Sequence, residues 1–285
     1  MEYFYEIAGI CIRVSGFDDC MYSDHGVLEP FRVHGRLDYI HSFCFSLVDT
    51  LAPEEGECIY QDGSKRVYRT ADAFVRYVGS TDYTHMRIHR QGSVSQIQCL
   101  SSSYPDGITP KTVLNAMEGE HLFTQNHALI LHASFIQVNK KAILFTAPSG
   151  TGKSTQAALW CRHRGAELIN GDRTALALDG DQVYACGIPF SGSSGVAKNA
   201  KLPLAAIVYL SQAAENRVEV LRGISAFRKV WEGISVNTWD RSDLDLASDR
   251  LLKVLEKVPV FHLSCRPDED AVNLLHFHLN EKGGL

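Results

Sequence analysis

The pattern of apolar and polar positions divides the chain into two parts that meet near residue 125. In the first part, short apolar stretches separated by turn residues recur at close intervals, which is typical of β-strands. We therefore expect residues 1–125 to form an antiparallel, β-rich lobe, with a short helix over residues 112–120. The stretches with this signal are Ile7–Val14, Arg66–Tyr68, Ala73–Val78, His85–Ile88 and Val94–Leu100.

The second part, residues 126–285, mixes strand patterns with helical periodicity. Ala128–Val138 and Ala142–Ala147 predict two strands joined by a tight turn, and residues 154–164 predict a helix that Gly165 ends. The turn Asp179-Gly180 indicates a hairpin, which argues against a plain doubly wound parallel sheet. We predict an α/β domain with a mixed sheet. Further strands are expected over 167–169, 174–178, 182–185, 205–210 and 260–263, and helices over 225–232, 242–257 and 267–280.

A glycine-rich sequence follows the second of these strands directly. Residues 147–154 read Ala-Pro-Ser-Gly-Thr-Gly-Lys-Ser, which is typical of a phosphate-binding loop that opens a helix. Ala147 stands where the full motif has glycine, so this position must not require a positive φ. The alternative is a strand-to-helix turn that binds nothing. The predicted nucleotide contacts are Ser149, Gly150, Thr151, Gly152, Lys153, Ser154 and Thr155.

Two residues outside this loop are candidates for the chemistry. Phosphoryl transfer needs charge neutralisation, and Mg²⁺ prefers oxygen ligands; Ser154 and Asp172 are the predicted metal ligands. Asp172 has a structural alternative as a turn residue. His132 lies on the strand before the loop's own strand, where a lone histidine is commonly a core residue. The glycine-serine segment 187–195 is either a connector or a flap that contacts substrate.

The order of these motifs resembles the catalytic domain of the HPr kinase/phosphorylase family. His132 precedes the loop by the family's spacing, and Gly165 to Arg173 follow the helix in the family's order. The resemblance covers residues 128–185. It implies a phosphoenolpyruvate-carboxykinase-like P-loop core, with ATP and Mg²⁺ as cofactors and a serine hydroxyl of a peptide or protein as acceptor. It implies that His132 and Asp172 are catalytic. Gly171 departs from the family pattern, which has an aspartate there as the usual candidate base.

A looser similarity in residues 189–212 is to HPr-kinase-related proteins of peptide natural-product clusters. These include kinases that phosphorylate the carboxy-terminal serine of lasso-peptide precursors, which implies such a peptide as a candidate acceptor. Because Gly171 replaces an acidic residue, the alternative function is a non-catalytic, ATP-binding regulatory module. Decarboxylation chemistry of the carboxykinase type ranks last, because it needs a fuller cationic metal site than the sequence offers.

Composition narrows the classes of partner. The 285 residues are 45% hydrophobic and 21% charged, which is ordinary for a soluble protein. The net charge of −5, without a lysine/arginine tract, gives no reason to expect nucleic acid. No stretch approaches the roughly 20 apolar residues that a membrane span needs. Eight cysteines without a Cys-x-x-Cys pair, and no amino-terminal signal pattern, predict a cytoplasmic protein with reduced thiols. The oligomeric state stays open, a homo-oligomer included.

Overall fold

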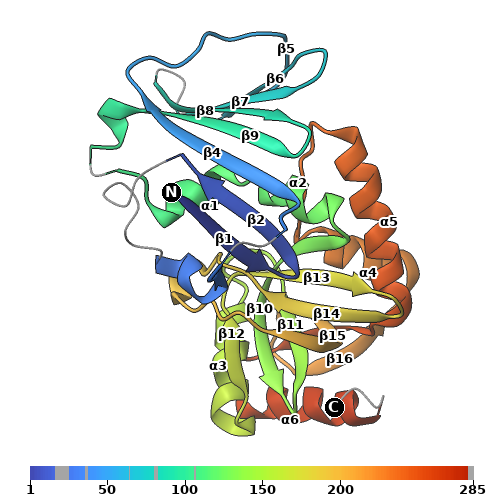
Figure 1. Ribbon diagram of the computed structural model, residues 1–285. Coiled ribbons are helices and arrows are strands. Elements are labelled where there is room, and N and C mark those ends of the chain that lie inside the picture. Colours follow the sequence, from blue (N-terminus) through green and yellow to red (C-terminus); the bar gives the residue numbers. More distant parts are fainter. Residues whose placement is uncertain (17–25, 36–37, 64, 80–82, 106, 282–285) are drawn as a thin grey trace. The chain divides into compact units, whose positions relative to one another are not determined.

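The computed structural model of the chain describes residues 1–16, 26–35, 38–63, 65–79, 83–105 and 107–281 (Figure 1). The chain folds into two units, Met1–Glu118 and Gly119–Leu285. Each unit has its own sheet, and the two are described separately.

The first unit is built on one sheet of strand order β3-β1-β2-β4-β9-β8-β7-β6-β5. Short helices η1 (Gly26–Phe31), η2 (Ser101–Ser103) and α1 (Pro110–Ala116) complete it. The strands are β1 (Glu2–Ile7), β2 (Ile10–Ser15), β3 (Arg32–Val33), β4 (His41–Val48), β5 (Glu57–Asp62), β6 (Lys65–Arg69), β7 (Phe74–Gly79), β8 (Thr84–Gln91) and β9 (Val94–Leu100).

The prediction of a β-rich lobe is confirmed, but the prediction that it is antiparallel throughout is wrong. β4 pairs in parallel with both β2 and β9. Local turn signals predict only hairpins, whereas β4 is inserted between strands far from each other in sequence. The predicted strand Ile7–Val14 is also two strands, because Ala8 and Gly9 have φ angles of 55° and 80° and reverse the chain.

The predicted helix over residues 112–120 is two helices. Thr109 caps α1 in a reciprocal arrangement with Thr112, and Pro110 occupies the first turn, where a missing N–H costs nothing. Glu118 then has a φ of 48°, which interrupts the helical path. The next helix, α2 (Gly119–Gln125), belongs to the second unit.

The second unit carries a mixed sheet of order β11-β10-β13-β14-β15-β18-β16, as the sequence predicts. β11 also pairs in parallel with β15, so β11, β10, β13, β14 and β15 form a closed circuit. The strands are β10 (Ala128–Val138), β11 (Lys141–Thr146), β12 (Glu167–Asn170), β13 (Arg173–Asp179), β14 (Gln182–Gly187), β15 (Lys201–Gln212), β16 (Arg217–Leu221), β17 (Ile234–Ser235) and β18 (Val260–Cys265).

Helices cover this sheet from two sides, and alternating residues of the strands serve each side. In β11, Ala142 and Leu144 pack in the cluster with α4 (Gly223–Trp231) and α5 (Arg241–Lys257). Ile143 and Phe145 pack in the cluster with α3 (Lys153–Arg164) and α6 (Glu269–Glu281). A strand buried on both faces reads as a continuous apolar run, which explains the apolar run that ends at the glycine-rich sequence.

The turn between β10 and β11 sets the register of that pair. Asn139 and Lys140 both have positive φ, 49° and 62°, as a two-residue type I′ turn requires. Val138 therefore pairs with Lys141, and Ala133 with Thr146 at the far end.

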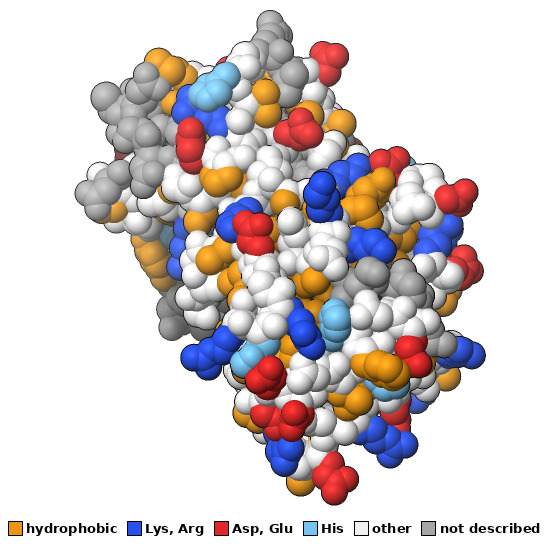
Figure 2. All heavy atoms as spheres, turned by 90° about the horizontal axis from the view of Figure 1, so that it is seen from below, with side chains coloured by type: hydrophobic (Ala, Val, Ile, Leu, Met, Phe, Trp, Pro, Cys, Tyr) orange, Lys and Arg blue, Asp and Glu red, His pale blue; other side chains and the backbone are white. Residues whose placement is uncertain are grey.

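Within the described residues, no helix combines the length and apolar character that a membrane crossing needs. On the face drawn in Figure 2, basic and acidic side chains of the described residues are intermingled.

We expect Trp160→Ala to lower the free energy of unfolding of the second unit by about 3–5 kcal/mol, because deleting a buried aromatic side chain leaves a cavity. Trp160 is fully buried and its ring lies 6.3 Å from that of Phe145. Urea denaturation followed by circular dichroism measures the change. Leu252→Ala is the control, because Leu252 is 49% exposed and its truncation should cost much less. Equal losses in the two variants would contradict this description of the core.

Candidate functional site

The glycine-rich loop, residues 147–152, connects the end of β11 to the start of α3. Gly150 and Gly152 have φ angles of 79° and 119°, a region that favours glycine. Ala147 is not among the described residues with positive φ, so alanine fits there without strain. The first N–H groups of a helix lack intrahelical partners, and no side chain caps α3. These groups are therefore available to bind an anion.

Lys153, the first residue of α3, folds back over this loop. Its Nζ donates hydrogen bonds to the carbonyl oxygens of Ala147 at 2.9 Å and Pro148 at 3.3 Å. Burial lowers the pKa of Lys153, while the charge of Asp172 acts in the opposite direction. Asp172 is thus close enough for its charge to act on the lysine of the loop.

Strand pairing brings His132 to the same place. In β10, His132 lies opposite Arg173 of β13, and its neighbour Ala133 lies opposite Thr146 at the end of β11. The hydroxyl of Thr146 donates to the carbonyl oxygen of His132 at 2.9 Å. The register of two strand pairs therefore fixes His132 between the start of the loop and Asp172.

The side chains around Asp172 form a short polar row. Asp172 Oδ1 lies 3.3 Å from His132 Nε2, and Asp172 Oδ2 lies 3.6 Å from Arg173 Nε. The guanidinium of Arg173 lies in turn over the ring of Phe190, at 5.6 Å. The three polar side chains are 30–38% exposed. Ion pairs as exposed as these contribute about 0–1 kcal/mol to stability, so stability alone does not account for the row.

The surroundings of His132 favour its neutral form. Burial, followed by the positive charge of Lys153, lowers the pKa of His132, and the carboxylate of Asp172 offsets only part of this effect. A neutral imidazole at pH 7 can accept a proton from a hydroxyl group.

Asn170, which the sequence analysis did not select, holds Asp172 in position. It is fully buried, and its Oδ1 accepts hydrogen bonds from the N–H groups of Asp172 at 2.9 Å and Arg173 at 3.0 Å. Its Nδ2 donates to the carbonyl oxygen of Ile188 at 2.8 Å. The turn sequence Asn-Gly-Asp is the signal that points to such a role, because asparagine commonly bonds to the backbone two residues on.

The segment that follows β14 packs directly on Gly171 and Asp172. A β-carbon at Gly171 would overlap with the side chain of Ser194, and one at Gly192 would lie 2.6 Å from Cβ of Asp172. Gly171 therefore has no room for an aspartate side chain while Ser194 lies there. The short helix η3 (Gly192–Ser194) carries this contact.

Pockets lie on either side of the start of α3. Two of them, of about 450 and 410 Å³, share Gly150, Thr151 and Gln212; Thr155 lines the first and Ser149 the second. A third, of about 490 Å³, is lined by Ser154, Gly171 and Ser194 among others. Volumes of about 300–1,000 Å³ suit small ligands. The seven predicted nucleotide contacts lie in the glycine-rich loop or in the first turn of α3. Among them, Ser154 lines the pocket that Gly171 also lines.

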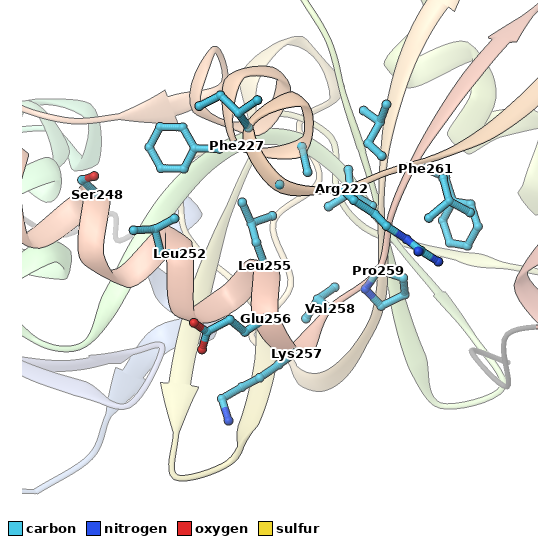
Figure 3. A pocket seen from close by; sticks show the side chains of 16 residues that line it. Arg222, Phe227, Ser248, Leu252, Leu255, Glu256, Lys257, Val258, Pro259 and Phe261 are labelled. Carbon is cyan, nitrogen blue, oxygen red and sulfur yellow. The ribbon is translucent and has the colours of Figure 1, made fainter.

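A larger pocket, of about 690 Å³, lies among α4, α5, β16 and β18 (Figure 3). Its lining is largely apolar, with Phe227, Leu252 and Leu255 prominent and with Arg222, Glu256 and Lys257 adding charge. None of the predicted site residues lines it. The larger cavity and the candidate chemistry therefore lie in different places.

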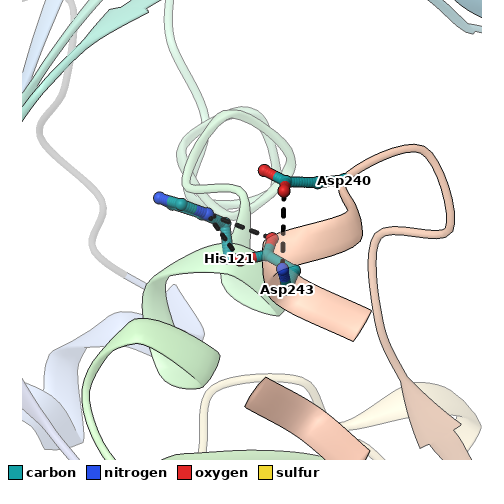
Figure 4. Close-up of side chains that lie close together, drawn as sticks. All are labelled: His121, Asp240 and Asp243. Atoms are coloured by element: carbon teal, nitrogen blue, oxygen red, sulfur yellow. Dashed lines mark hydrogen bonds and ion pairs between the residues drawn. The ribbon is translucent and has the colours of Figure 1, made fainter. Parts of the chain in front are cut away.

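His121, Asp240 and Asp243 form a cluster that the sequence analysis also missed (Figure 4). Asp243 is fully buried, and it accepts hydrogen bonds from His121 Nδ1 at 3.0 Å, Gln125 at 2.9 Å and Asn237 at 3.1 Å. Burial alone raises the pKa of Asp243, but these donors, His121 foremost, outweigh it and lower the pKa overall. Asp240 caps the first turn of α5. Protein donors thus satisfy the buried carboxylate, and the cluster ties α2 to α5.

Comparison with known proteins gives a distant likeness among solved structures. No family model matches the chain, and no curated protein matches it in sequence. Among solved structures, the HPr(Ser) kinase/phosphatase from Coxiella burnetii matches with 16% sequence identity and a TM-score of 0.29. The match covers 54% of this chain and 94% of that one.

We expect Asn170→Ala to lower the free energy of unfolding by about 3 kcal/mol, because the three hydrogen bonds of this side chain, of about 1 kcal/mol each, are lost. Thermal and urea unfolding of the purified chain measure the change. Asn280→Ala is the matched control, because Asn280 is exposed and its side chain bonds to His276 in the same helix. If the two variants were equally stable, Asn170 would not hold the turn.

Proposed function

We propose that the chain is an ATP-dependent kinase that transfers the γ-phosphate to a serine hydroxyl of a peptide or protein. The observation that carries the proposal is the meeting of three groups at the glycine-rich loop. Lys153 lies over the loop, and His132 and Asp172 lie 3.3 Å apart within reach of its charge.

Each part of the site has a role in this proposal. The N–H groups of Gly150 to Thr155 and the ammonium of Lys153 bind the β- and γ-phosphates. Asp172 orients the acceptor hydroxyl and receives its proton, and the neutral His132 next to it shares that task. Phosphoryl transfer is catalysed largely by positioning and charge neutralisation, which is what this set of groups offers.

The donors present are compatible with Mg²⁺. Ser154 is exposed at the pocket that Gly171 also lines, and the side chain of Asp172, the next residue after Gly171, is 30% exposed. A hydroxyl and a carboxylate are oxygen ligands of the kind that Mg²⁺ takes together with phosphate. When bound, the ion neutralises charge on the phosphate oxygens; Ser154 and Asp172 would hold it.

The acceptor is proposed as a peptide because the 490 Å³ pocket beside Ser154 is lined mainly by small side chains, including Ser134 and Ala158. Such a pocket suits a short side chain such as serine on an extended chain. The loose similarity of residues 189–212 to lasso-peptide precursor kinases supports a carboxy-terminal serine as the finer proposal. The cysteines in the described part of the chain are free, which supports a reducing, cytoplasmic setting.

A non-catalytic, ATP-binding regulatory module is the second candidate. The observation that favours it is the packing of Ser194 on Gly171, which leaves no room for a second carboxylate at position 171. Asp172 is then the one carboxylate of residues 171 and 172. Both candidates require Mg-ATP binding. They differ in turnover, so binding without phosphate transfer to any acceptor, including the chain itself, would favour the module.

We expect Lys153→Ala to weaken Mg-ATP binding by about tenfold to 100-fold, because a charge-assisted contact is worth about 1.5–3 kcal/mol. Asp172→Asn should keep binding within a few-fold and lower kcat by about 100-fold or more. Calorimetry and an ADP-release assay separate the two effects. Lys201→Ala is the control, because Lys201 pairs with Asp179 at an exposed position. Unchanged binding in Lys153→Ala would reject the phosphate site.

We expect kcat/KM to fall on the acid side with an apparent pKa below the ordinary histidine value of 6.5. The pKa of His132 is lowered by burial and by Lys153, so the imidazole is neutral above that value and becomes protonated as the pH falls through it. A pH–rate profile of the wild type and of His132→Gln measures this. An acid limb that is the same in both proteins would remove His132 from the mechanism.

A further inference from the structure

The segment between β14 and β15 places a serine hydroxyl at the candidate site. Ser194 ends the short helix η3 and is exposed to solvent. Its side chain fills the space that a side chain at Gly171 would take, while Gly192 of the same helix packs on the carboxylate of Asp172. The serine is thus held against the Gly171-Asp172 pair by two contacts.

Hydrogen bonds hold the hydroxyl in one place. Ser194 Oγ donates to the carbonyl oxygen of Ser191 at 2.7 Å and accepts from the N–H of Val196 at 3.2 Å. An ordered hydroxyl loses little further freedom on the way to a reactive geometry.

The same hydroxyl lies on the side of the loop where a transferable phosphate would be. Ser154 and Ser194 line one pocket of about 490 Å³. The pockets shared by Gly150, Thr151 and Gln212 lie on the other side and suit the nucleoside end of a nucleotide. A triphosphate that ran along the loop from Gln212 toward Ser154 would end at the pocket that Ser154 and Ser194 both line.

From this arrangement we propose that Ser194 is a phosphorylation site that the chain modifies in its own active site. The inference rests on the proposed kinase function and names an acceptor for it. The bond between the γ-phosphorus and the bridging oxygen breaks, and ADP leaves with the electron pair. A bond forms between the γ-phosphorus and Ser194 Oγ; the hydroxyl gives up its hydrogen bond to the Ser191 oxygen, and its proton passes to the Asp172 carboxylate. Substrate and product are ATP and ADP, so no further reactant is needed.

The structure distinguishes Ser194 from the other serines of the segment. The three atoms nearest to a β-carbon at Gly171 come from Ser194 and from the backbone oxygen of Ser191, and none comes from Ser193. Phosphorylation at Ser194 would add a charge of about −1.5 to −2 next to the carboxylate of Asp172. The two like charges repel, so the modified segment would leave Gly171 and open the pocket to an external acceptor.

The test is incubation of the purified full-length chain with Mg-ATP, followed by intact-mass measurement and mapping of phosphopeptides. We expect the mass to rise by one phosphoryl group, with the phosphate on Ser194, at a rate per chain that does not depend on protein concentration. The signal should be lost in Ser194→Ala and in Lys153→Ala. It should be retained in Ser193→Ala, the matched control in the same helix.

The outcomes separate this inference from the proposed function. Mg-ATP binding and ADP release without phosphate on the chain would overturn the role of Ser194 and leave the kinase proposal standing. Phosphate on Ser191 or Ser193 instead, or phosphate on Ser194 that persists in Lys153→Ala, would also overturn it. No binding of Mg-ATP in calorimetry would overturn the proposed function itself. Mapping on the wild-type chain does not depend on whether the variants fold.

Discussion

The candidate site depends on the pairing of β10 with two neighbours at once. Its antiparallel register with β11 places His132 next to the end of the strand that leads into the glycine-rich loop, and its register with β13 places His132 opposite Arg173. A slip of one residue in either pair would turn His132 to the other face of the sheet. The tight turn at Asn139 and Lys140 fixes one register, and the buried residues on both faces of β10 fix the other.

A second constraint is the fully buried side chain of Asn170. Its three hydrogen bonds hold the turn that presents Asp172 and bind the segment after β14 to it. Gly171 and Gly192 then allow close approach, so that a serine hydroxyl occupies the place of a missing side chain. The absence of a side chain at Gly171 and the position of Ser194 thus belong to one packing arrangement. This link joins the segment 187–195 to the turn that carries Asp172.

Sequence reasoning predicted the second unit better than the first. β10 has the predicted bounds, and the left-handed cap at Gly165 after α3 is present, with a φ of 61°. These elements have strong local signals: long apolar runs, glycine at the cap and turn residues with positive φ. β4, β16 and β17 carry weak signals and were not predicted, and the parallel pairs of β4 depend on contacts between strands distant in sequence. The turn within residues 7–14 was not predicted, because Ala8 is not a usual turn residue.

The sequence by itself determined the glycine-rich loop, its lysine and hydroxyl, and the order of His132 and Asp172 around it, because the positive φ angles and the helix start are local requirements. It also determined that the second sheet is mixed, through its hairpin turns. Only the tertiary structure decided that Asn170 supports Asp172, that Ser194 lies on Gly171, and that His121 satisfies Asp243. These contacts join residues from separate elements. Packing decides which side chains meet there, and a local sequence pattern does not predict that packing.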